Sequence, residues 1–216
     1  MIISLSGWKG SGKDEAARIL TNKYGFRRLA FADILKDMVA RDYGISRESL
    51  DDPKLKEKPL LQYPVNPSDG FTKMLYTFMV KELRDANGNK APECEYSKLP
   101  QLYHTPRSLA ILMGSTNRFV QSNFWVQKAL SSISKNENVI ITDMRYNSEM
   151  SQITDFAKDS GHTLSFVRVN RFAISPSQDP SERDLDNAKF DFTLDNKGTL
   201  KEFEAKVLDW AKKYVF

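Results

Sequence analysis

The chain has 216 residues, a length that suits one domain with a buried core and is short for two independent domains. Hydrophobic residues make up 40% of it and charged residues 28%, and no apolar run approaches the roughly 20 residues that span a bilayer, which argues against a membrane-spanning protein. The formal net charge of +4 suits a protein that handles polyanions, and the dispersal of the basic residues disfavours a nucleic-acid-binding surface.

Cysteine and histidine are scarce, with one cysteine and two histidines in the whole chain. A single thiol forms no internal disulfide, and Cys94 with His104 and His162 is a poor ligand set for zinc. The opening apolar run Met1–Ser6 is too short for a signal peptide and follows no basic stretch. We therefore expect a cytoplasmic protein.

The N-terminal part alternates strands with helices. Ile2–Ser6 is an apolar strand, and the periodicity predicts a helix over about Lys13–Tyr24. Arg27–Phe31 is a second predicted strand, after which Asp33 is expected to cap a helix that ends at Gly44.

Residues 46–104 have a different character, because prolines interrupt the pattern repeatedly. Only Phe71–Leu83 has the periodicity of a dependable helix there. A structureless loop of this length is unusual in a compact domain. We expect a functional insertion with helices of its own.

Regular alternation returns after this segment. Thr105 and Pro106 open a predicted helix through about Phe119, and Phe124–Ile133 is another. The remaining predicted elements are strands at Asn138–Thr142, Thr163–Val169 and Asp191–Leu194, and helices at about Ser148–Lys158 and Leu200–Tyr214. This alternation predicts an α/β protein with a mostly parallel sheet of five strands and helices on both of its faces.

The turn after the first strand reads GWKGSGKD and matches the spacing G-x-x-x-x-G-K of a phosphate-binding loop, the P-loop or Walker A motif. Its glycines permit positive φ angles, which let the backbone N–H groups face an anion at the start of the next helix. Lys13 adds a cation that can follow charge onto a transferred phosphoryl group. The predicted nucleotide-binding residues are Gly7, Trp8, Lys9, Gly10, Ser11, Gly12, Lys13 and Asp14.

Asp14 departs from the usual motif, in which Ser or Thr follows the lysine and binds magnesium through its hydroxyl. A carboxylate at this place can hold magnesium directly or through water, or it can simply favour the positive end of the helix. The sequence leaves both interpretations open.

Asp143 follows the strand NVIIT directly, at the edge of the sheet where a Walker B acid is found. It can organise magnesium-bound water, accept a substrate proton or serve only as a turn residue. Arg145 lies on the same rim and can neutralise a phosphate, with Glu149 orienting it by a salt bridge. An exposed ion pair without a role in binding is the alternative.

Further arginines are candidates for phosphate contacts. Arg107, at the start of its helix, is placed to bind an acceptor phosphate or to be solvated. Arg171 and Arg183 lie in a loop of about residues 171–188, which has the composition of a lid that excludes water during transfer. An ordinary exposed loop is the alternative.

Separated blocks of the sequence together resemble the tailed-phage deoxynucleoside monophosphate kinases, within the P-loop nucleoside monophosphate kinases. The resemblance extends over nearly the whole chain and is weakest in residues 46–100. The blocks are Leu5–Asp14, Arg107–Thr116, Asp143–Arg145 with Glu149, and Asp191–Leu200.

The resemblance implies one P-loop NTPase domain of three layers over residues 1–216, with an acceptor-binding insertion at about 46–104. It implies ATP as donor, Mg²⁺ as cofactor and a deoxynucleoside 5′-monophosphate as acceptor. The turn with Asn196 and Gly198 is expected near the donor's adenine, or else only precedes a helix. Phe31 and Lys36 are expected to face the acceptor, although Phe31 can instead belong to the core.

The resemblance also implies a role in deoxynucleotide biosynthesis, in the host cytoplasm if a bacteriophage encodes the chain. Small-molecule nucleotides are the expected partners, and a homodimer stays open. Alternatives are a P-loop kinase of another metabolite, such as dephospho-coenzyme A or phosphomevalonate, and a DNA-directed kinase or ATPase. Also open are the accepted bases, direct magnesium binding by Asp14, and which lid arginine contacts the phosphoryl group.

Overall fold

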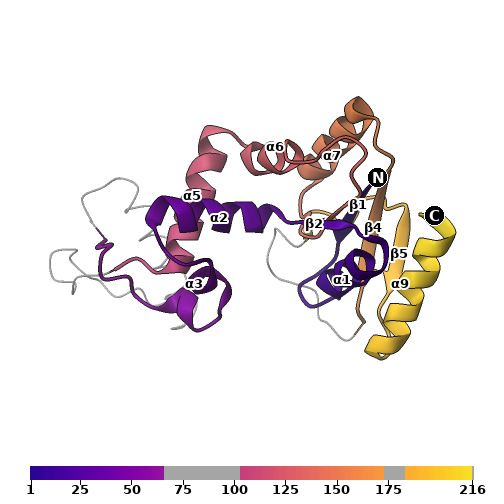
Figure 1. Ribbon diagram of the computed structural model, residues 1–216, viewed down its shortest axis with the longest axis horizontal. Helices are drawn as coiled ribbons and strands as arrows, with labels where there is room; N and C mark the ends of the chain where they lie inside the picture. Colours follow the sequence, from indigo (N-terminus) through magenta and orange to yellow (C-terminus); the bar gives the residue numbers. More distant parts are fainter. Residues whose placement is uncertain (66–102, 173–182, 216) are drawn as a thin grey trace. The chain divides into compact units, whose positions relative to one another are not determined.

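The computed structural model describes residues 1–65, 103–172 and 183–215 (Figure 1). They form two compact units, which we call the sheet unit (Met1–Ile34 with Gln121–Phe216) and the helical unit (Leu35–Val120). The predicted helix Phe71–Leu83 lies outside the described residues, as does the middle of the predicted lid. No helix in the described ranges is long and apolar enough to cross a membrane.

The sheet unit is built on a five-stranded sheet in the order β2-β3-β1-β4-β5, and every strand pairs in parallel with its neighbours. The register places Ile3 of the central strand between Ile140 and Ser165. The strands are β1 (Ile2–Ser6), β2 (Arg27–Leu29), β3 (Val139–Ile141), β4 (Leu164–Asn170) and β5 (Phe192–Asp195). The predicted parallel sheet of five strands is confirmed.

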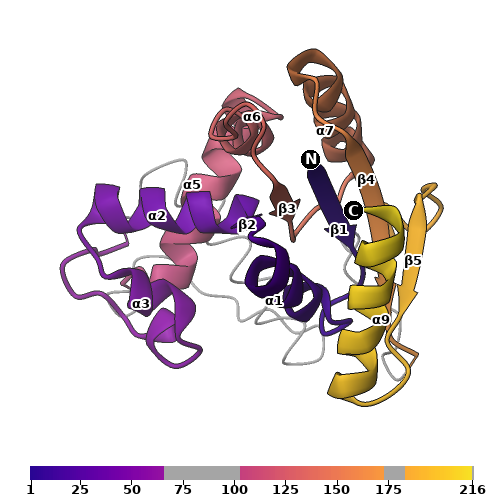
Figure 2. The ribbon, with the colours of Figure 1, turned by 45° about the vertical axis from the view of Figure 1, so that its right-hand side comes forward.

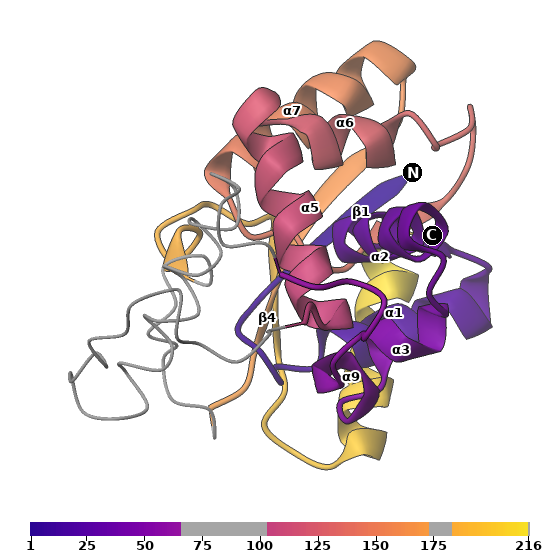
Figure 3. The ribbon, with the colours of Figure 1, turned by 90° about the vertical axis from the view of Figure 1, so that its left-hand side faces the viewer.

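Helices cover both faces of this sheet, with α1 and α9 on one side and α6 and α7 on the other (Figures 2 and 3). Both faces are therefore shielded, and β1 is buried throughout, its serines Ser4 and Ser6 included. Ala16 and Leu20 of α1 join Phe203 and Val207 of α9 in the main core. The helices are α1 (Lys13–Tyr24), α6 (Phe124–Leu130), α7 (Asn147–Ser160) and α9 (Leu200–Tyr214).

The described part of the helical unit is a small helical assembly around Val39, Leu50 and Leu109. Helix α2 starts in the sheet unit and continues into this one. The elements are α2 (Phe31–Tyr43), α3 (Arg47–Asp51), a short 3₁₀ helix η1 (Leu55–Glu57) and α5 (Pro106–Val120). Thr105 accepts a hydrogen bond from the N–H of Ser108 at 3.1 Å, which confirms the predicted cap of α5.

Several elements differ from the sequence prediction. Strand β2 ends at Leu29 and not at Phe31, because α2 already begins at Phe31. Helix α2 begins at Phe31, so Asp33 lies inside its first turn and is not its cap. Helix α6 ends at Leu130 and not at Ile133, because Ser131 already forms its C-terminal cap. Helix α3, which Ser46 caps by accepting the N–H of Ser49 at 3.2 Å, was missed because five residues are too few to show a period.

Candidate functional site

The P-loop connects β1 to α1 through three glycines in the left-handed region, with φ of 146° at Gly7, 79° at Gly10 and 110° at Gly12. A Cβ atom at Gly7 would lie 2.3 Å from the carbonyl oxygen of Val169 and 2.7 Å from Oγ of Ser11. The loop therefore requires glycine both for its backbone angles and for the closeness of β4.

Lys13 lies back over the loop, where its ammonium donates hydrogen bonds to the carbonyls of Gly7 at 2.6 Å and Trp8 at 3.0 Å. The hydroxyl of Ser11 is buried, and within the described residues it has no hydrogen-bond partner. A buried polar group of this kind is costly unless a ligand or water satisfies it. Together with the N-terminus of α1, Ser11 and Lys13 suit a bound phosphate.

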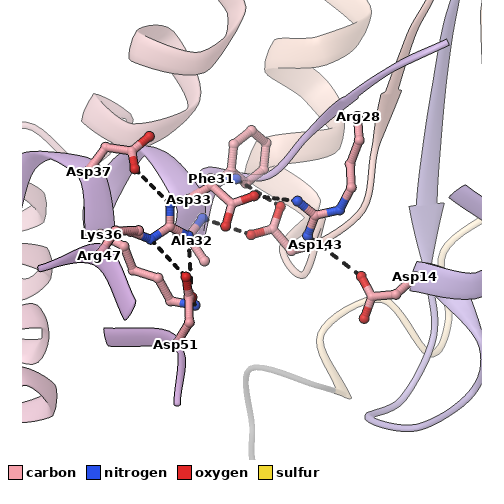
Figure 4. Close-up of polar contacts among 10 residues, drawn as sticks. All are labelled: Asp14, Arg28, Phe31, Ala32, Asp33, Lys36, Asp37, Arg47, Asp51 and Asp143. Carbon is pink, nitrogen blue, oxygen red and sulfur yellow. Dashed lines mark hydrogen bonds and ion pairs between the residues drawn. The ribbon is translucent and has the colours of Figure 1, made fainter. Parts of the chain in front are cut away.

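Asp143 follows β3 and contacts the start of α2. Its two carboxylate oxygens each accept one first-turn hydrogen bond, from the N–H of Phe31 and from that of Ala32, both at 2.9 Å (Figure 4). Burial raises the pKa of Asp143, and these donors and Arg145 oppose that rise. Asp143 thus caps α2, which explains the early start of this helix, and the side chain of Phe31 is buried, as the core interpretation expects.

Arg28 lies among several carboxylates, a feature that the sequence analysis missed. Its guanidinium forms an ion pair with Asp33 and lies 3.7 Å from Asp14 (Figure 4). The charge of Asp143 also acts on it. A basic residue inside a predicted strand is the only sequence signal of this arrangement, because the three acids come from separate elements.

Magnesium in nucleotide sites usually takes one or two carboxylates and completes its coordination with phosphate oxygens and water. Within the described ranges no three His, Cys, Asp or Glu side chains gather as a metal site. The Asp14 side chain is 83% exposed and hence accessible, whereas the oxygens of Asp143 already accept backbone N–H groups. These residues fit a magnesium ion that arrives with a nucleotide, which Asp14 would hold directly or through water and Asp143 through water.

Glu149 is only 8% exposed and supports the turn before α7. Its Oε2 atom accepts the backbone N–H of Arg145 at 2.7 Å and that of Tyr146 at 3.1 Å. Glu149 therefore fixes the backbone of Arg145 from a buried position, which the surface ion-pair interpretation did not anticipate. The side chain of Arg145 remains exposed on this rim.

Asp186, at the end of the predicted lid, is a second residue that the sequence analysis missed. Its carboxylate accepts hydrogen bonds from Nε1 of Trp8 at 3.2 Å and from Arg168 at 2.7 Å. Arg168 also donates to Oγ of Ser6 at 3.2 Å, and Arg183 lies 3.8 Å from Asp186. These contacts join the end of the lid segment to the P-loop.

The other predicted lid arginine, Arg171, donates to the carbonyl of Gly10 at 3.4 Å. Asn196 donates to the carbonyl of Ser11 at 3.0 Å, so the ends of β4 and β5 both reach the P-loop. A cavity of about 290 Å³ lies beside them, lined by Trp8, Ser11, Val169, Asn170, Arg171 and Phe172.

Asn196 and Gly198 differ in what they do for the turn before α9. A Cβ at Gly12 would lie 2.7 Å from Nδ2 of Asn196, so the amide packs closely on the P-loop. A Cβ at Gly198 would lie 2.2 Å from Oε2 of Glu202, the carboxylate that accepts the N–H of Thr199 at 2.7 Å. Gly198 therefore makes room for the helix cap, and Asn196 is the residue in contact with the loop.

In the helical unit, the predicted acceptor-binding cations have carboxylate partners. Lys36 pairs with Asp51 at 2.7 Å, and Arg47 lies 3.2 Å from the same carboxylate (Figure 4). Arg107 pairs with Glu57 at 2.5 Å. The side chains of Arg107 and Glu57 are both half exposed, so a phosphate could compete for this arginine.

A parallel sheet of this order, with a glycine-rich P-loop between its central strand and the first helix, defines an α/β protein with a P-loop phosphate-binding fold.

No family model matches the chain. It is 28% identical over 217 residues to the "Putative deoxynucleotide monophosphate kinase" of Acanthamoeba polyphaga mimivirus, covering 96% of this chain and 94% of that protein.

Solved structures similar to this chain include two kinases. An APS kinase from Mycobacterium tuberculosis has a TM-score of 0.37 and 10% identity, over 98% of this chain and 96% of that one. The dephospho-CoA kinase from Campylobacter jejuni has a TM-score of 0.41 and 13% identity, with the same coverage of 98% and 96%.

Proposed function

We propose that this chain is a kinase that transfers the γ-phosphoryl group of ATP to a deoxynucleoside 5′-monophosphate, giving ADP and a deoxynucleoside diphosphate. The observation that carries the proposal is the P-loop at the start of α1, with Lys13 and the buried hydroxyl of Ser11, which has no hydrogen-bond partner among the described residues. The similarity to the mimivirus protein supports a kinase, and the name of that relative supports the acceptor class.

Lys13 is the central residue of the proposed transfer. Its ammonium now bonds to two loop carbonyls, and both contacts can be exchanged for oxygens of the β- and γ-phosphates. Such a cation stabilises the negative charge that develops on the transferred group, which usually contributes a factor of about 10² or more to the rate. Ser11 and the N–H groups of the loop would hold the phosphates in line.

Magnesium, when bound, neutralises charge on the donor phosphates. Asp14 is the exposed carboxylate beside Lys13 that would hold it, and Arg28, at 3.7 Å, keeps Asp14 near the loop. Asp143 keeps its bonds to the first turn of α2 and would contribute through water. Asp14 and Asp143 would thus hold the ion with the donor, although the described residues contain no preformed cluster of three metal ligands.

Each unit contains candidate contacts for an acceptor phosphate, which are two arginines and a lysine in all. Arg145 belongs to the rim of the sheet unit, where Glu149 fixes its backbone. Lys36 and Arg107 belong to the helical unit, where carboxylates hold them in place until a phosphate competes. We propose that the segment 46–104 determines which base is accepted and that Arg171 and Arg183 belong to a lid over the donor.

A coupled assay of ADP formation tests this function. The enzyme is given ATP and Mg²⁺ with each of the four deoxynucleoside and four ribonucleoside monophosphates in turn, and Lys13→Ala serves as the inactive control. We expect ADP formation that depends on at least one deoxynucleotide. No ADP above the ATP-only rate with any nucleotide would refute the proposal, and activity confined to dephospho-coenzyme A or phosphomevalonate would assign another acceptor.

A further inference from the structure

The P-loop has a different environment on each side of the central strand β1. On the side of β3 and β2, Asp143 holds the start of α2, and the chain runs on to the residues proposed to bind the acceptor. On the side of β4 and β5 lies the cavity of about 290 Å³, to which Trp8 and Ser11 of the P-loop contribute. If the phosphates lie on the loop, this second side is left for the rest of the donor.

The size of the cavity suits a nucleoside. Pockets for small ligands start at roughly 300 Å³ and combine apolar walls with a few polar groups. Here Val169, Trp8 and Phe172 provide the apolar surface. Asn170 and Arg171 add polar groups, and Arg171 also reaches the carbonyl of Gly10.

Phe172 is the distinctive residue of this cavity, because it is an aromatic lining residue and is still 67% exposed. A single exposed aromatic residue is ordinary on a protein surface. This ring, however, has the ammonium of Lys197 at 4.0 Å from its centroid, and Lys197 is itself 3.2 Å from Asp195. The turn after β5 therefore contacts the ring of Phe172 through Lys197.

We propose that Phe172 is the platform on which the base of the donor nucleotide stacks. An exposed aromatic face beside a phosphate site binds a nucleobase through its π surface, whichever base it is. The ammonium of Lys197 lies over this ring, so the base would stack on the opposite face of the ring. This inference rests on the proposed function, since it assumes a nucleoside triphosphate as donor. It adds Phe172 to the turn with Asn196, which the sequence resemblance places near the donor's adenine.

Titration calorimetry with two ligands separates stacking from phosphate binding. One ligand is a non-hydrolysable ATP analogue and the other is inorganic tripolyphosphate, each with Mg²⁺. Stacking of one base on an aromatic residue corresponds to a loss of about 5-fold to 100-fold in affinity when the ring is removed. We expect Phe172→Ala to weaken binding of the analogue by this factor and to leave tripolyphosphate binding unchanged.

Two further variants make the result specific. Phe172→Trp keeps an aromatic surface and should retain affinity for the analogue. Val120→Ala removes another exposed apolar side chain, 80% exposed, at the end of α5 and should change neither ligand's affinity. Far-ultraviolet circular dichroism of each variant verifies that the fold is retained.

The platform is refuted if Phe172→Ala weakens neither ligand, or weakens both equally, because the ring would then act on the loop and not on a base. Failure of the kinase proposal is a separate result. If the wild type binds the analogue in a Phe172-dependent way but forms no ADP with any monophosphate, the platform stands and the proposed acceptor falls. An analogue that does not bind the wild type at all refutes both.

Discussion

Removing the Glu149 carboxylate tests how the rim that carries Arg145 is held. In Glu149→Ala, the N–H groups of Arg145 and Tyr146 lose their acceptor at a buried site. A hydrogen bond to a charged group contributes about 1.5 to 3 kcal/mol, and a buried donor left unpaired costs a similar amount. With partial access of water to the turn, we expect the free energy of unfolding to fall by about 3 kcal/mol.

Glu149→Gln makes the prediction sharper, because both N–H groups bond to the same oxygen, Oε2. One amide oxygen can accept both bonds, so the loss in Glu149→Gln should be smaller than in the alanine variant, about 1 kcal/mol for the weaker, uncharged acceptor. Urea unfolding at neutral pH measures both losses, with Glu204→Ala, an exposed position on α9, as the control expected to change stability by less than about 0.5 kcal/mol. Equal losses of stability for the alanine and glutamine variants would refute the role of Glu149 as the acceptor of these two N–H groups.

Three other predictions concern Gly7 of the P-loop, the ammonium of Lys13 and the partly buried His104. Gly7→Ala places a Cβ 2.3 Å from the carbonyl oxygen of Val169. We expect the free energy of unfolding in urea to fall by about 2 kcal/mol or more and calorimetry to show no ATP binding. Wild-type stability and ATP binding would contradict the loop geometry. Lys13→Ala should lower kcat by about 10²-fold or more while thermal melting changes little; a fall in melting temperature that accounts for the lost activity would argue against a catalytic role. Burial lowers the pKa of His104, so the unfolded chain binds more protons than the folded chain. Stability should therefore decrease as pH falls through the ordinary histidine pKa and level off below the lowered value. His104→Gln should flatten this dependence when unfolding is measured from pH 8 to 5, and an unchanged slope would contradict the prediction.

Local signals predicted several elements with their boundaries. The strand Ile2–Ser6 and the helices Lys13–Tyr24 and Leu200–Tyr214 have the predicted bounds. Their ends are set by nearby residues: Gly25 adopts a left-handed conformation after α1, and Thr199 with Glu202 forms a capping box before α9. Such signals lie within a few residues of the feature that they determine.

Contacts between distant parts of the chain could not be predicted in this way. Asp143 caps α2 from more than 100 residues away, which moved the start of that helix ahead of Asp33. Asp186 reaches Trp8 across a separation of 178 residues, and no motif marks it. The P-loop, by contrast, needs only its own glycines and the strand and helix beside it, so its residues could be named from the sequence.

Phosphoryl transfer itself is the central claim, and ³¹P nuclear magnetic resonance observes it directly. The wild-type enzyme is incubated with ATP, Mg²⁺ and each deoxynucleoside monophosphate, and the spectrum is followed over time. We predict that the γ-phosphate signal of ATP declines while signals of ADP and of a second, deoxynucleoside diphosphate rise together. Release of inorganic phosphate alone, or an unchanged spectrum with all four acceptors, would contradict the account.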